Sequence, residues 1–288
     1  MKKKSRLILC AIIILLLCLI VPGFYNAMHV VRYDLHTGKI GGSIRIALVT
    51  DLHSCAYGAA QSTLLDAIDK EEPDLVLLGG DIFDQNLPDD NAVAFLQKVS
   101  SRYPCYFVTG NHEYHKGKHA FSDRMAILDE CGITRLSGEM ASVEINGTHL
   151  NICGLDDPYE WADGIEQSES DLLHFHEQLK QVASLPEDVA SYTILLTHRP
   201  EMFELYRQYD FDLVLAGHAH GGQWRIPGIL NGLYAPGQGL FPAYAGGQYE
   251  QNGTTMIVSR GLALESTWVP RFYNRPELVI VTLEGANP

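Results

Sequence analysis

The sequence predicts an α/β fold in which one soluble domain contains two β-sheets. Five short apolar runs each end in turn residues that include Asp, Asn or His, and such runs are typical of buried strands. Segments with helical periodicity separate the first runs, which indicates parallel strands joined by right-handed crossovers. After His220 the pattern changes to short strands with Gly and Pro turns. With 288 residues, 46% of them hydrophobic, the chain is long enough to bury a full core.

The individual elements follow from the two periodicities of helices and strands. In the helix predicted at 61–71, for example, Leu64, Leu65 and Ile68 share one face. Further helices are predicted at 91–100, 121–131 and 172–182. Strands are predicted at 46–49, 75–78, 106–108, 194–196, 213–216, 256–258 and 278–281. Because the sequence has no internal repeat, one domain with two sheets explains the pattern better than two domains.

The first 28 residues are predicted to form a membrane anchor. Four basic residues among the first six precede an uncharged stretch at 7–27 that is dominated by Leu and Ile. Roughly 20 apolar residues are enough to span a bilayer. A cleaved secretion signal is the alternative, but no clear cleavage site follows Val21, so we favour an uncleaved anchor. The predicted organisation is a cytoplasmic tip and transmembrane helix at 1–28, a connector at 29–43 and a soluble domain at 44–288.

Charge predicts that the amino end lies in the cytoplasm and the soluble domain outside it, because basic residues hold a flank on the cytoplasmic side. The four cysteines beyond the apolar stretch, Cys55, Cys105, Cys131 and Cys153, argue mildly against this orientation, since unpaired thiols are uncommon in oxidising compartments. We expect Cys105 and Cys153 to be small core residues, and a disulfide that includes Cys55 stays open. No CxxC spacing is present, which disfavours a zinc ribbon or a redox motif.

The excess of acidic over basic residues argues against nucleic acids as partners. The formal net charge is −14, and without the four leading basic residues 17 basic residues face 35 acidic ones. Such a surface repels long polyanions, because nucleic-acid binding depends on basic patches. A nuclease of duplex DNA is therefore disfavoured, whereas a small nucleotide substrate is not excluded.

The residues that close the five apolar runs predict a metal site. Parallel strands bring their carboxyl ends to one edge of a sheet, where the sites of α/β proteins form. Asp, Asn and His side chains together suit Mn²⁺, Fe²⁺ or Zn²⁺ better than Ca²⁺, which prefers oxygen ligands alone. The predicted cluster consists of Asp51, His53, Asp81, Asn111, His112, His198, His218 and His220.

The order D-x-H, G-D-x-x-D, G-N-H-E, H, G-H-x-H resembles the calcineurin-like metallophosphoesterase superfamily, over residues 44 to 283. The sequence from His218 to Gln223, with Arg260-Gly261 and the segment from Arg271 to Glu277, is similar to its bacterial membrane-anchored branch. That branch includes YaeI-type phosphodiesterases and the UDP-2,3-diacylglucosamine hydrolase relatives. The resemblance implies a sandwich of two mixed β-sheets flanked by helices. It also implies that residues 44–288 form a metallophosphoesterase catalytic domain.

The resemblance further implies two divalent metal ions. One would be held by Asp51, His53, Asp81 and His220, and the other by Asp81, Asn111, His198 and His218. A hydroxide between the two cations would attack phosphorus. His112 would lie over the substrate and protonate the leaving group, and Asp84 would orient its imidazole.

These residues predict a membrane-anchored two-metal enzyme that hydrolyses a phosphodiester or a pyrophosphate, with a substrate that is lipid-linked in the interpretation we favour. A UDP-2,3-diacylglucosamine-type pyrophosphatase is the alternative, and a silent scaffold of the same fold is a weaker one. Arg199 is a weak candidate for binding the phosphate. Trp161, Trp224 and Tyr234 are placed in loops near the mouth of the site. Residues expected to have no chemical role are His115, His119, His174 and His176, and a simple turn is expected at Asp156 and Asp157.

Overall fold

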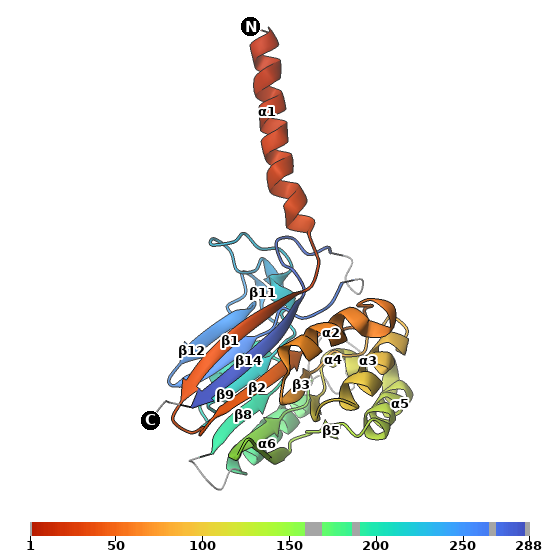
Figure 1. Cartoon of the computed structure of the whole chain (residues 1–288), viewed down its shortest axis with the longest axis vertical. Helices are drawn as coiled ribbons and strands as arrows, with labels where there is room; N and C mark the ends of the chain where they lie inside the picture. The colour runs from red at the N-terminus through yellow and green to blue at the C-terminus, as the bar shows by residue number, and fades with distance from the viewer. Residues whose placement is uncertain (1, 159–168, 186–190, 265–268, 286–288) are drawn as a thin grey trace.

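The computed structural model describes residues 2–158, 169–185, 191–264 and 269–285. A single helix, α1 (Lys2–Ile20), projects from the domain, and a 3₁₀ turn at Val21–Phe24 joins it to the first strand (Figure 1). In the part of the chain that is described, α1 with its following turn is the one helix long and apolar enough to cross a membrane. The domain that follows is an α/β fold with two mixed six-stranded sheets, as predicted.

The first sheet has the strand order β1-β14-β2-β3-β4-β5. β14 is antiparallel to β2, and the other neighbours are parallel. The segment predicted as a connector contains β1, which pairs with β14 at the outer edge of this sheet. The strands are β1 (His29–Thr37), β2 (Ser43–Val49), β3 (Leu75–Gly79), β4 (Cys105–Val108), β5 (Thr134–Arg135) and β14 (Glu277–Gly285).

The second sheet has the strand order β12-β13-β9-β8-β7-β6, with antiparallel pairs at both edges and parallel strands between them. Its strands are β6 (Met140–Ile145), β7 (Thr148–Gly154), β8 (Tyr192–Leu196), β9 (Leu213–Ala216), β12 (Gly247–Gln251) and β13 (Thr254–Val258). A small separate ribbon pairs β10 (Tyr234–Ala235) with β11 (Gly239–Leu240).

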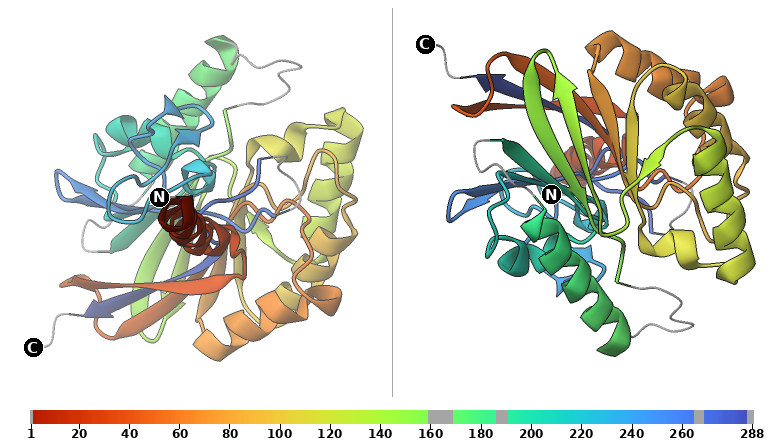
Figure 2. Two further views of the ribbon diagram at one scale, coloured as in Figure 1. Left: turned by 90° about the horizontal axis from the view of Figure 1, so that it is seen from above. Right: turned by 90° about the horizontal axis from the view of Figure 1, so that it is seen from below.

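Helices cover the outer faces of both sheets (Figure 2). α2 (Ser62–Glu71), α3 (Asp90–Ser100) and α5 (Gly117–Glu130) pack on the first sheet, and α6 (Glu169–Ser184) and α7 (Phe203–Tyr206) pack on the second. The single turn α4 (Asn111–Tyr114) follows β4. All four predicted helices and all seven predicted strands are therefore present, within a few residues of their expected bounds.

Between the sheets lies a layer of aliphatic side chains from both inner faces. It includes Ile46 and Leu48 of β2 with Ile194 and Leu196 of β8, all fully buried. Burial of this layer fixes the two sheets face to face, so the carboxyl ends of β2, β3, β4, β8 and β9 meet at one edge. Cys105 and Cys153 are buried core residues, as predicted, and none of the six cysteines forms a disulfide.

Candidate metal centre

The predicted cluster forms at the edge where the parallel strands of both sheets end. The first sheet supplies Asp51 and His53 after β2, Asp81 after β3, and Asn111 after β4. The second sheet supplies the rest from the turns after β8 and β9, namely His198, His218 and His220. The sandwich thus brings together groups from both sheets that neither sheet could gather alone.

Two groups of candidate ligand atoms share the carboxylate of Asp81. In each group the ligand atoms all lie within 4.8 Å of one another, and every residue is buried. Asp81 Oδ2 lies 3.1 Å from His198 Nε2 and 3.5 Å from His53 Nε2. The first group is Asp51, His53, Asp81 and His220, and the second is Asp81, His198 and His218.

Hydrogen bonds around the cluster direct several ligand atoms inward, although the ring nitrogens of His218 lie 3.2 Å from His198 Nε2 and 2.7 Å from Arg199 Nη1. His53 Nδ1 pairs with Asp84 Oδ2 at 2.9 Å, and His198 Nδ1 pairs with the carbonyl of Gly79 at 2.8 Å, so both rings turn Nε2 towards Asp81. Buried Asp81 Oδ2 and His53 Nε2 have no hydrogen-bond partner among the described residues. Buried polar atoms without a partner are costly, and this pattern is consistent with a dimetal site.

The electrostatics of the cluster favour an anionic bridge and neutral outer imidazoles. Burial would raise the pKa of Asp81, but the nearby imidazoles of His198 and His112 hold it well below its ordinary value. Burial would lower the pKa of His198, but the charge of Asp81 raises it to about 10, so a cation bound by this ring would have to displace its proton. Burial, with neighbouring positive groups, places the pKa values of His218 and His220 well below the ordinary value. Neutral imidazole is the form that binds a metal.

Backbone conformation also sets this edge apart. Five of the candidate ligands have positive φ angles, a region that residues other than glycine rarely adopt: Asp51 at 50°, His53 at 48°, Asp81 at 53°, His218 at 64° and His220 at 47°. Such strain persists only where the surroundings determine the conformation, and it concentrates at functional sites.

Asp84 lies closer to His53 than to the residue it was expected to orient. Asp84 Oδ2 is 2.9 Å from His53 Nδ1 but 3.5 Å from His112 Nδ1. Burial would raise the pKa of Asp84, but both imidazoles and the backbone amides of the following turn hold it below its ordinary value. One ionised carboxylate therefore supports two rings, whose centroids are 4.3 Å apart.

Glu113 is a structural member of the site to which the sequence analysis gave no role. Its buried carboxylate accepts hydrogen bonds from the backbone amides of Asp81, Ile82, Phe83 and Gly110, at 2.6 to 3.2 Å. It therefore ties the turn after β3 to the turn after β4. Burial and the charge of Asp81 raise the pKa of Glu113 to about 7. The sequence did contain a signal for Glu113, because it is the fourth residue of the Gly-Asn-His-Glu motif.

Arg199 lies beside the cluster in a rigid ion pair. Its Nε and Nη2 contact the two carboxylate oxygens of Asp157 at 2.5 and 2.9 Å, and both residues are buried. Its guanidinium also lies 2.7 Å from His218 Nε2 and 3.3 Å from Asn111 Oδ1. Asp157, expected only as part of a turn, lies in an irregular segment after β7, where its buried carboxylate positions Arg199.

Among the described residues, the histidines expected to have no chemical role and the aromatic residues expected near the mouth lie outside the cluster. His119 and His176 are exposed, as is His174, whose ring pairs with Gln178. His115 is half-buried, with its ring 4.8 Å from that of His112. Trp224 and Tyr234 lie at the mouth of the site, whereas Trp161 lies outside the described residues.

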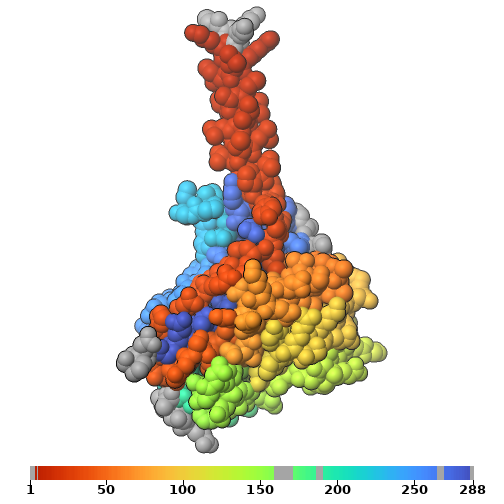
Figure 3. Space-filling view, viewed as in Figure 1, coloured from red at the N-terminus to blue at the C-terminus, as the bar shows by residue number. Residues whose placement is uncertain are grey.

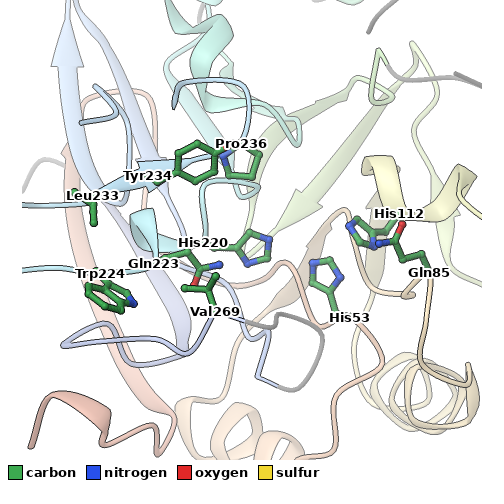
Figure 4. A pocket seen from close by; sticks show the side chains of 10 residues that line it. All are labelled: His53, Gln85, His112, His220, Gln223, Trp224, Leu233, Tyr234, Pro236 and Val269. Carbon is green, nitrogen blue, oxygen red and sulfur yellow. The ribbon is translucent and has the colours of Figure 1, made fainter. Parts of the chain in front are cut away.

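A cavity of about 670 Å³ opens beside the cluster (Figure 4). His53, His112 and His220 line one part of it, next to Gln85 and Gln223. Apolar side chains line the remainder, namely Trp224, Leu233, Tyr234, Pro236 and Val269. The exposed side of the metal cluster therefore faces a space of the size that holds small-molecule ligands.

Comparisons with known proteins agree with this geometry. Residues 44–222 match the family model described as calcineurin-like phosphoesterase. An uncharacterized metallophosphoesterase of Aquifex aeolicus is 31% identical over 90% of this chain and 92% of its own length. One from Helicobacter pylori is 28% identical over 83% of this chain, which spans 60% of that relative's length.

Two further similarities are to a protein described as a transmembrane protein and to a solved structure. A Bos taurus protein described as a transmembrane protein with metallophosphoesterase domain is 29% identical over 85% of this chain and 54% of its own length. The solved structure of TT1561 from Thermus thermophilus, at 14% identity, covers 76% of this chain and 90% of its own, with a TM-score of 0.50. This last likeness concerns the fold alone.

Proposed function

Because this chain belongs to the calcineurin-like phosphoesterase family, we propose that it is a two-metal phosphoesterase that cleaves a phosphodiester or pyrophosphate bond. The observation that carries the proposal is the sharing of Asp81 by two buried groups of ligand atoms. A carboxylate between two cations suits the spacing of about 3.5–4 Å found in two-metal phosphatases. Phosphodiesterase action and the identity of the metals, among Mn²⁺, Fe²⁺ and Zn²⁺, are parts of this proposal.

The residues of the two groups would divide between two cations. Asp51, His53 and His220 would hold the first together with Asp81. His198 and His218 would hold the second with the same carboxylate, and Asn111 would complete the set with its amide oxygen. When bound, such cations stabilise the charge of the phosphoryl group and lower the pKa of bound water.

His112 would provide the proton for the leaving group. Its side chain is partly exposed at the cavity wall, in contrast to the enclosed imidazoles of the cluster. Burial would lower the pKa of His112, but the carboxylates of Asp81 and Asp84 raise it above its ordinary value, which favours the protonated ring. Arg199, held by Asp157, would add a fixed positive charge near the phosphate.

Hydrolysis of bis-p-nitrophenyl phosphate with added Mn²⁺ tests the proposal. Asp81→Asn should lower turnover by more than about a thousandfold, because it weakens both cation sites. The exposed Asp66→Asn on α2 is the matched control and should keep wild-type turnover. His112→Ala should cost about 10²- to 10⁴-fold, while the exposed His119→Ala should cost nothing. Wild-type turnover in both Asp81→Asn and His112→Ala would exclude this mechanism.

Metal analysis separates an enzyme from a silent scaffold of the same fold. The purified protein should contain close to two transition-metal ions per chain, and Asp81→Asn should contain fewer. A wild-type protein that binds no transition metal, even when Mn²⁺, Fe²⁺ or Zn²⁺ is supplied, would favour the scaffold.

We also propose that α1 stays attached as an anchor, with the catalytic domain on the extracytoplasmic side. The support is the length and exposure of α1, the basic residues before it, and the membrane protein among the relatives. Enzymatic reporters fused to the carboxyl end test the orientation. A reporter active only in the cytoplasm would reverse the orientation and would favour the UDP-2,3-diacylglucosamine-type alternative, whose substrate is made there.

A further inference from the structure

The cavity beside the metal cluster has two chemically different ends. Figure 4 shows the imidazoles of His53, His112 and His220 on one side and the side chains of Trp224, Leu233 and Tyr234 on the other. A phosphoester that binds at the imidazoles would therefore place the rest of its structure against apolar groups. A water-soluble sugar or nucleotide would find few hydrogen-bonding partners on that wall.

The apolar wall belongs to a segment, 223–246, that is unusual within this acidic chain. Arg225 is its one charged residue, although the whole chain carries 35 acidic residues. Seven large apolar side chains are exposed outside residues 7–25 in the part of the chain that the structure describes, and six of them lie in this segment. They are Trp224, Ile226, Ile229, Tyr234, Leu240 and Phe241, with Ile229 83% and Phe241 67% exposed. We name these six the apolar lip.

Exposed apolar side chains gathered on one surface of a soluble domain mark an interaction site. The position of the lip indicates the partner. In Figure 1 the loops around β11 rise beside the base of α1, and Figure 3 shows the same loops, in cyan, projecting next to the helix. The candidate span Arg6–Phe24, which runs through α1 into the turn after it, has 19 residues, about 28 Å at a helical 1.5 Å per residue, which matches the hydrocarbon core of a bilayer. A bilayer crossed by α1 would meet the lip.

Residues 272–275 connect the lip to the chain that directly follows α1. The ring of Phe272 lies 5.1 Å from that of Phe24 and 5.6 Å from that of Trp224, between centroids. Tyr273 donates a backbone hydrogen bond to the carbonyl of Gly23, and Arg275 Nε donates to the carbonyl of Ala27 at 2.7 Å. Since Trp224 also lines the cavity, one aromatic cluster connects the anchor, the lip and the active-site wall.

We propose that the substrate is a lipid phosphodiester taken directly from the bilayer. This inference rests on the proposed phosphoesterase function and adds its substrate class. The lip docks on the membrane surface, the hydrocarbon chain lies along Leu233, Tyr234 and Val269, and the phosphate reaches His112. The oxygen of water bonds to phosphorus, the P–O bond to the leaving alcohol breaks, and that alkoxide takes a proton from His112. One proton of the water stays on the phosphate, and the other passes to solvent, from which His112 regains its proton. The products are a phosphomonoester and an alcohol.

A chain-length series tests the substrate class. The full-length protein in nanodiscs is given p-nitrophenyl ethyl phosphate or p-nitrophenyl hexadecyl phosphate, and release of p-nitrophenol is followed with added Mn²⁺. KM should be at least about tenfold lower for the long chain, because burial of each methylene is favourable. Equal KM values for the two esters would overturn the lipid inference and leave the phosphodiesterase intact. Hydrolysis of neither ester would instead overturn the proposed function.

Matched variants connect the effect to the cavity wall. Leu233→Ser or Tyr234→Ser should reduce the advantage of the long chain, which is the ratio of KM for the ethyl ester to KM for the hexadecyl ester, to less than about three. Leu173→Ser is the control, because Leu173 is exposed on α6, outside the lip, and it should keep the full advantage. Metal content reports whether each variant is folded. A wild-type advantage in folded Leu233→Ser and Tyr234→Ser would contradict the assigned wall.

Membrane docking has a test that does not depend on activity or on metal. In proteoliposomes that contain phospholipids brominated along the acyl chain, tryptophan fluorescence should be quenched through Trp224. Trp224→Phe, which keeps an aromatic ring, should lose most of this quenching, while Trp161 and Trp268 supply the same remaining signal in both proteins. Equal quenching in the two proteins would contradict docking of the lip.

Discussion

The metal cluster and the apolar lip border the same cavity, yet they are built by different means. The cluster consists of polar groups from five turns, all buried except the partly buried Asn111 and His112, and each turn is anchored by a strand of the core. The lip consists of exposed apolar groups on one long segment between β9 and β12 that has little regular structure. The cluster is determined by the interior of the protein, whereas the lip is suited to a partner outside it.

This difference explains why the two regions respond differently to change. A buried polar group must keep its partners, because a polar group left unsatisfied in the interior costs free energy of folding. An exposed apolar side chain can be replaced at little cost to the free energy of unfolding. We therefore expect substitutions in the cluster to affect metal content, stability and turnover together. Substitutions in the lip, and in the apolar cavity wall that it adjoins, should affect substrate preference alone.

Removal of the metals gives the largest effect. Extended treatment with a chelator should abolish hydrolysis of bis-p-nitrophenyl phosphate and lower the melting temperature. A ligand at a hundredfold excess over its dissociation constant stabilises a protein by about 2.7 kcal/mol. Added Mn²⁺ should restore both values. A melting temperature that is unaffected by the chelator would show that the cluster is stable without cations.

Glu113→Gln should have the next largest effect. An amide oxygen can replace only part of a carboxylate that accepts four backbone hydrogen bonds, and each amide left without a partner costs about 1–3 kcal/mol. The thermal unfolding temperature and the affinity for Mn²⁺ should both fall. Glu130→Gln, at an exposed position near the end of α5, is the control. Wild-type values in Glu113→Gln would mean that the turns after β3 and β4 do not depend on this carboxylate.

Asp84→Asn tests whether one carboxylate supports two imidazoles. Loss of a group that orients a metal ligand lowers metal affinity or activity by about 10- to 100-fold. Because Asp84 is nearer to His53 than to His112, titration with Mn²⁺ should show weaker binding as well as slower turnover. Unchanged Mn²⁺ affinity with slow turnover would assign Asp84 to His112 alone.

Leu233→Ala should have the smallest effect on a water-soluble substrate. The apolar wall contributes little to the binding of bis-p-nitrophenyl phosphate if its role is to hold a hydrocarbon chain. We expect its KM to change by less than about threefold and metal content to stay at the wild-type value, since most contact residues contribute little. A tenfold loss of turnover would show that the wall also shapes the metal cluster.

The fold and the cluster could be predicted because both depend on local patterns. A buried strand followed by Asp, Asn or His is visible in the sequence, and a fixed order of such turns makes the combination specific. β6 and β7 were not predicted, although Asn146-Gly147 joins them with φ angles of 52° and 75°, and an Asn-Gly pair is a strong hairpin signal.

The supporting contacts could not be predicted in the same way. Glu113 and Asp157 act on residues 32 and 42 positions away, Asp81 and Arg199. No periodicity carries such pairings, because they arise only when neighbouring strands pair, β3 with β4 in the first sheet and β7 with β8 in the second. Trp224 and Tyr234 were expected near the mouth of the site, but the lip as a whole was not predicted, since single exposed apolar residues are common on proteins and become informative only when the fold gathers them.

The pairing of β1 with β14 has a consequence for biogenesis. Nine residue pairs join the strand directly after the helix to the last strand of the chain, from His29–Glu277 to Thr37–Gly285. Because β14 also separates β1 from β2, the first sheet stays divided until the ribosome has made β14. A nascent chain would therefore remain open along two strand edges, and would depend on protection from aggregation until β14 emerges.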